Sequence, residues 1–128
     1  VCAELERQLG ELDPEDARDY LASLGLERSA LDSVVTAGYR LLDLITFFTI
    51  KGIETRAWTV RLGTPAPKAA GKIHTDMERG FIRAEVIQWD LLMQEGSFGA
   101  AREHGRVRTE GKDYIVQDGD VILFRFNV

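Results

Sequence analysis

Few residues of this chain carry side chains suited to covalent or acid–base chemistry, and they lie far apart in the sequence. His74 is followed by Asp76, a spacing that allows an acid–base pair, and Cys2 is the only thiol. No second histidine or cysteine stands at metal-ligand spacing from His74, so a cap at a helix end is the simpler interpretation of it. We expect no catalytic role for Cys2, next to the first residue, and expect His104 to be solvated in a glycine-bounded loop. The sequence therefore predicts no catalytic residue and no metal site.

Nucleotide and cation binding also lack a clear signal in the sequence. The motif G-x-x-x-x-G-K-[ST], whose backbone binds nucleotide phosphates, does not occur. The acid pairs Asp118/Asp120 and Glu110/Asp113 could bind a cation, but the glycines beside them are more typical of turns. We therefore expect no cofactor in this chain.

Three arginines are the best candidates for ligand binding. In the strands expected below, Arg61, Arg83 and Arg125 stand opposite the more apolar positions. If the apolar positions face a covering helix, the three guanidinium groups share the open face of one sheet, where they suit phosphate recognition. Two alternatives stay open: a solvated face on which the arginines pair with Glu85, or a face covered by another domain.

The elements that would position these arginines centre on residues 68–87. Residues 68–73 predict a short helix, because their apolar side chains can share one helical face. Residues 75–80 predict a polar turn that ends this helix, and residues 81–87 predict a half-buried strand. The helix is therefore expected to lie across a sheet.

The remaining strands follow from the same patterns. Residues 45–50 and 56–62 predict a hairpin, residues 95–105 a loose loop with three glycines, and residues 121–126 an apolar strand in the centre of the sheet. A small sheet with a covering helix is an α+β arrangement, and a β-grasp is the simplest fold of this order.

A helical segment precedes the sheet. Residues 4–12 predict a first helix, and Asp13-Pro14 begins a second, because aspartate caps helices and proline suits their first turn. A third is expected over residues 29–44, where Gly38 suggests a close packing partner. Three short helices bury little surface alone, so we expect them to need another surface. The sequence thus predicts a helical segment over residues 1–43 and a β-grasp domain over residues 44–128.

The charge of the chain is unevenly distributed. Residues 1–52 carry ten acidic and five basic side chains, whereas residues 53–128 carry eleven of each, and the whole chain has a net charge of −5. This balance argues against nucleic-acid binding by bulk positive charge and leaves any basic patch to the second part. The single cysteine favours a reducing, cytoplasmic location, and no apolar run approaches the ~18 residues of a membrane span.

Several of these stretches resemble a known family. The runs AGKIHTDMERGFIRAEVI (residues 70–87) and EGKDYIVQDGDVILFRFNV (residues 110–128) are similar to the C-terminal TGS-type domain of the YchF/Obg-like ATPases. LITFFT and RAWTV, from residue 44 onward, match the start of that domain, so the resemblance covers residues 44–128. The earlier helices, with their LDPE turn, resemble the segment that joins the nucleotide domain to the TGS domain.

The resemblance implies a non-catalytic C-terminal module of a ribosome-associated protein. The parent protein would bind ATP or GTP with Mg²⁺ through a P-loop domain that this chain lacks. The implied partners are the ribosome or its RNA and the nucleotide-binding domain of the same protein, with no membrane, and Arg61, Arg83 and Arg125 are the candidate RNA contacts. The alternative is a β-grasp module that binds protein and not RNA.

Overall fold

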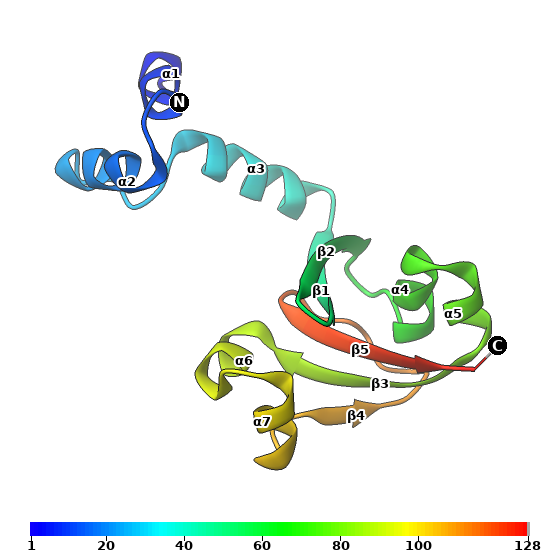
Figure 1. Cartoon of the computed structure of the whole chain (residues 1–128). Helices are drawn as coiled ribbons and strands as arrows, with labels where there is room; N and C mark the ends of the chain where they lie inside the picture. The colour runs from blue at the N-terminus through cyan, green and yellow to red at the C-terminus, as the bar shows by residue number, and fades with distance from the viewer. Residues whose placement is uncertain (128) are drawn as a thin grey trace. The chain divides into compact units, whose positions relative to one another are not determined.

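The computed structural model describes residues 1–127, which divide into a helical unit, Val1–Leu42, and a sheet unit that begins at Asp43 (Figure 1). The helical unit contains α1 (Ala3–Gly10), α2 (Pro14–Ser23) and α3 (Ala30–Leu41). The sequence placed the change between residues 43 and 44.

Local signals set the ends of these helices. The carboxylate of Asp13 accepts hydrogen bonds from the backbone N–H groups of Glu15 and Asp16, each at 3.0 Å, which caps α2 as expected. After α2, Gly25 takes a φ of 71°, a left-handed conformation in which glycine pays no steric cost. Ser29 caps α3 through its hydroxyl, which accepts from the backbone N–H of Asp32 at 3.1 Å.

The helical unit buries little of its apolar surface. Leu9 and Leu21 are its buried apolar side chains among the described residues, and α3 buries none. A Cβ built on Gly38 would meet nothing within 4 Å, so the close partner expected there is not found in residues 1–127. The apolar positions of α3 are thus exposed in this chain.

The sheet unit contains one mixed sheet with the strand order β2-β1-β5-β3-β4. Its strands are β1 (Leu44–Lys51), β2 (Glu54–Arg61), β3 (Phe81–Gln88), β4 (Arg108–Glu110) and β5 (Asp120–Phe126). β1 and β2 form the expected antiparallel hairpin, and β5 lies parallel to β1 and antiparallel to β3. The α+β class and the central final strand are confirmed, while the β-grasp name stays our interpretation of this order.

Helices lie on both faces of the sheet, as Figure 1 shows. One face is covered by α4 (Ala66–Ile73) and α5 (Thr75–Arg79), the other by α6 (Trp89–Glu95) and α7 (Phe98–Glu103). We had predicted a turn at residues 75–80 and a loop at residues 95–105. Both predictions are wrong where the chain forms α5 and α7.

Thr75 and Asp76, which we interpreted as turn formers, instead begin α5, and His74 caps a helix end as expected, because it ends α4 and begins α5. Nδ1 of His74 accepts from the backbone N–H of Asp76 at 3.1 Å, and the hydroxyl of Ser97 accepts from Ala100 at 3.1 Å. Short polar side chains favour turns and helix N-termini for the same reason: they hydrogen-bond nearby backbone groups. Composition alone did not separate the two outcomes.

The sheet accordingly has two apolar cores. The larger lies under α4 and α5 and includes the fully buried Phe47 and Val86. The smaller lies under α6 and α7 and joins Ile87, Ala101 and Val121. The face that we expected to be open is thus covered over its centre.

Candidate nucleic-acid interface

The strand register puts the three candidate arginines on the same side of the sheet. Arg83 on β3 and Arg125 on β5 are direct neighbours. β1 and β5 are joined at Phe48 and Val121, and alternation from this pair also turns Arg61, on β2, to that side. The three arginines therefore lie on the face of the sheet opposite α4, as the sequence predicted.

The three arginines do not form one patch, however. Arg61 pairs with Leu44, four positions before Phe48 on β1, whereas Arg125 lies four positions after Val121 on β5. This separates Arg61 from Arg125 by roughly 26 Å along the strands, at a rise of about 3.3 Å per residue. One phosphate group cannot contact both, so the candidate interface is reduced to the end of the sheet that carries Arg83 and Arg125.

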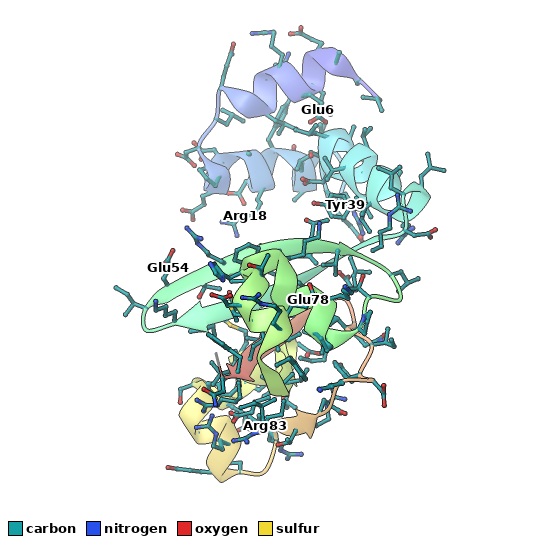
Figure 2. The ribbon with its side chains drawn as sticks, turned by 90° about the vertical axis from the view of Figure 1, so that its right-hand side faces the viewer. Glu6, Arg18, Tyr39, Glu54, Glu78 and Arg83 are labelled. Carbon is teal, nitrogen blue, oxygen red and sulfur yellow. The ribbon has the colours of Figure 1, made fainter. Side chains whose placement is uncertain are left out.

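A carboxylate lies at the centre of that end. Oε1 of Glu85 accepts from Nε of Arg125 at 3.0 Å, and Oε2 accepts from Nη2 of Arg102 on α7. Arg83, labelled in Figure 2, has its Nε 3.9 Å from Oε1, close enough for an ion pair but not a hydrogen bond. We call these four residues the arginine cluster; the ion pairs with Glu85 match one of the alternatives left open by the sequence.

Burial and charge differ sharply within the arginine cluster. The side chain of Glu85 is 10% exposed, whereas the side chains of Arg83, Arg102 and Arg125 are 44–51% exposed. Burial by itself would raise the pKa of Glu85, but hydrogen bonds from Arg125 and Arg102 outweigh it and hold that pKa below its usual value. Arginine stays protonated at any ordinary pH, so three cations surround one anion and leave an outward-facing excess of positive charge.

Arg102 is the member that sequence reasoning missed, because α7 was expected to be a loop. Its guanidinium lies over the ring of Phe98, 5.5 Å from the centroid, and reaches Glu85 from there. The signal that could have found it is Ser97, a good N-cap residue, three positions before the strong helix formers Ala100 and Ala101.

Arg61 borders a different basic site. Together with Lys68 and Lys72 of α4, it lines an open hollow of about 580 Å³ at the β2 edge of the sheet. Lys68 is paired with Glu78 on α5. Arg61 is thus a member of a second, more open basic region.

The residues weighed for catalysis or metal binding have structural contacts. His104 is exposed, as expected, and its ring also contacts the largely buried carboxylate of Glu95. Asp118 accepts from the backbone N–H of Thr46 at 2.8 Å, which ties a loop to β1 as turn residues do. Within residues 1–127 there is no group of three or more His, Cys, Asp or Glu side chains placed to hold a metal ion. Over the same residues, no helix has the length and apolarity to cross a bilayer.

Comparison with known proteins identifies the family of this chain. The model of the YchF-GTPase_C family, described as a protein of unknown function (DUF933), matches residues 44–127. This chain belongs to the YchF-GTPase_C family. Helices followed by a five-stranded sheet also match a solved member, the Schizosaccharomyces pombe YchF GTPase, with a TM-score of 0.81 and 36% identity over 94% of this chain and 32% of that one.

Curated relatives of this YchF-GTPase_C chain cover it fully or nearly so. The ribosome-binding ATPase YchF of Haemophilus ducreyi is 56% identical over all of the chain, and that of Bacillus subtilis is 51% identical. The Obg-like ATPase 1 of Rattus norvegicus is 50% identical over 96% of the chain. The chain spans about a third of the length of these relatives: 35% of the two bacterial proteins and 31% of the rat protein.

Proposed function

We propose that this chain is a non-catalytic module that contacts ribosomal RNA through Arg83 and Arg125. The observation that supports this most is the arginine cluster, in which exposed guanidinium groups surround one buried carboxylate. The bacterial relatives are named ribosome-binding ATPases, and the ribosome presents RNA phosphates in quantity. Guanidinium groups suit phosphates because their planar N–H groups match the phosphate oxygens.

The distribution of charge favours the sheet unit for this contact. The chain has a net charge of −5, and this excess of acid lies in residues 1–52. An RNA contact by this chain therefore depends on a local excess of positive charge. Such binding weakens with salt, because each neutralised phosphate releases condensed counterions.

The test is the binding of a fluorescently labelled ribosomal RNA hairpin, followed by anisotropy over a series of salt concentrations. The double variant R83Q/R125Q should flatten the log–log salt slope by roughly 1.4–1.8, about 0.7–0.9 for each lost phosphate contact. The matched control R56Q/R61Q removes the same charge from β2, far from the arginine cluster, and should change the slope little. If both double variants flatten the salt slope equally, the RNA is attracted by the positive charge of the sheet unit in general and not by the arginine cluster.

A second function is favoured by α3. Its exposed apolar side chains include Leu31, Val35 and Leu41, with 61%, 51% and 84% of their surface accessible. Glycine at position 38 leaves the helix backbone open to a close partner. We propose that this face docks on the nucleotide-binding domain of the same protein, since relatives of this chain are about three times as long.

Substitutions on that face test the docking. L31S/V35S should change the stability of the isolated chain by less than about 0.5 kcal/mol, because the two side chains are already in water. In a protein that includes the nucleotide domain, the same change should lower the melting temperature. A large loss of stability in the isolated chain would show that these residues pack within it.

The alternative to RNA binding is a sheet unit that binds only protein. An apolar pocket of about 350 Å³ is lined by residues of β1, β5, α4 and α5, among them Met77 and Phe124. A protein contact of this kind would bury apolar surface and depend weakly on salt. The salt series on RNA therefore distinguishes the two functions.

A further inference from the structure

We propose that Glu85 is a positioning residue, and that with Arg102 and Arg125 it forms a preorganised site for one phosphodiester group of RNA. This inference rests on the proposed RNA contact and deepens it. It assigns to the buried carboxylate the task of holding two guanidinium groups in place for a phosphate.

The geometry of Glu85 is that of a bridge. Each of its two oxygens takes one guanidinium: Oε1 accepts from Nε of Arg125 at 3.0 Å, and Oε2 accepts from Arg102. Arg125 uses Nε for this bond, so its two terminal nitrogens take no part in it. A guanidinium carries several donors in a fixed fork, and those not directed at Glu85 remain available to an anion.

The parts of this site come from three elements with their own packing. Glu85 and Arg125 lie on neighbouring central strands, β3 and β5, whose register joins Glu85 to Leu123 and Arg83 to Arg125. Arg102 comes from α7, where the ring of Phe98 lies under its guanidinium. A long side chain that is already ordered loses less entropy when it binds, which is worth roughly two- to tenfold in affinity for each side chain.

Two physical effects of Glu85 on RNA binding have opposite signs. As a negative charge it repels RNA, so its removal alone would strengthen binding. As the bridge between two arginines it orders the donors, so its removal would weaken binding. Because Glu85 is 7% exposed and each arginine is about half exposed, a ligand at this surface would contact the guanidinium groups and not the carboxylate. The positioning role requires that the ordering of the arginines outweigh the repulsion by the carboxylate, and the two effects predict opposite changes in affinity when Glu85 is replaced.

The experiment compares E85Q with E103Q by anisotropy on the labelled RNA hairpin at one fixed salt concentration. Glu103 is an exposed acid beside Arg102 on α7, so E103Q removes the same charge without touching the bridge. E103Q should bind RNA slightly more tightly than wild type, and E85Q roughly three- to tenfold more weakly. If E85Q binds as tightly as E103Q or more so, the positioning role is excluded.

The variant R102K gives a second test of the site, which does not require E85Q to fold. Lysine keeps the charge at an exposed position but loses the planar fork that spans Glu85 and a phosphate. We expect R102K to bind roughly three- to tenfold more weakly, and equal affinity to wild type would overturn the inference. If wild type itself fails to bind RNA, the proposed RNA function falls with it; if wild type binds and these variants do not weaken, only the site assigned to Glu85 falls.

Discussion

At the scale of single residues, the sheet unit contains a buried carboxylate, Asp120, that is stabilised by hydrogen bonds. Asp120 is fully buried, and its carboxylate accepts from the hydroxyl of Tyr114 at 2.7 Å, from Nε2 of Gln88 at 2.6 Å and from the backbone N–H of Gln117 at 2.9 Å. Buried charge is tolerated only with such a set of partners. The sequence had offered Asp120 as half of a possible cation site or as a turn former; it is instead the first residue of β5, and of its three bonds only the one from Gln117 spans the turn.

Loss of the Tyr114 hydroxyl should therefore destabilise the fold. Y114F leaves Asp120 with one hydrogen bond fewer and should lower the free energy of unfolding by about 1–3 kcal/mol, the range for a buried charged acceptor. Urea unfolding at neutral pH measures this. The control Y20F, in the helical unit, removes a hydroxyl that donates to Gln8 in a part-buried site and should cost less. If Y114F leaves the free energy of unfolding unchanged, a water molecule has replaced the hydroxyl as the partner of Asp120.

The same hydroxyl predicts an alkaline dependence of stability. Burial, and then its hydrogen bond to Asp120, raises the pKa of Tyr114 to about 12, against an ordinary value near 10. Because the pKa is higher in the folded state, the stabilisation is complete below pH 10 and is lost as pH rises from about 10 to 12. The difference in unfolding free energy between wild type and Y114F should shrink over that window. A difference that stays constant to pH 12 would contradict this assignment.

Elements were predicted best where one pattern dominated. The hairpin, the central strand over residues 121–126 and the start of α2 followed from alternation, continuous apolar sequence and a strong cap. α5 and α7 were missed because they are short, polar at their starts and flanked by glycines. That error concealed the second covered face and Arg102, which no alternation pattern could have placed near Glu85.

Between the two groups of elements, we expect unequal local stability. The helical unit has few buried side chains, whereas the sheet is packed on both faces, so the helices should open more readily. Amide hydrogen exchange should be slow in β1 and β5 and fast before Leu31. Equal protection throughout would show that the helices fold as one unit with the sheet.

At the scale of the whole molecule, the physical patterns of the sequence predicted the fold class but could not identify the family. Alternation and charge led to an α+β domain with an acidic helical segment, and the resemblance of residues 70–87 and 110–128 supplied the family. The ligand, the contact site and the parent activity do not follow from the arrangement of elements, because one fold can carry many functions. The proposals for RNA therefore depend on the arginine cluster and its chemistry.

Nucleotide binding by the isolated chain is expected to be absent. The sequence contains no G-x-x-x-x-G-K-[ST] loop, the element that holds the phosphates and Mg²⁺ of ATP or GTP in P-loop proteins. Titration calorimetry with Mg-ATP and Mg-GTP should show no heat above dilution. Micromolar binding of either nucleotide would reveal a site of another kind.

The most direct test of the RNA contact is a map of amide chemical shifts in the ¹⁵N-labelled chain as the unlabelled RNA hairpin is added. The proposed contact predicts shifts concentrated in β3, in α7 and in the second half of β5, around Arg83, Arg102 and Arg125, with the β2 end near Arg61 unchanged. Shifts confined to the pocket between β1 and β5, to the hollow beside Arg61 or to the helical unit would contradict it.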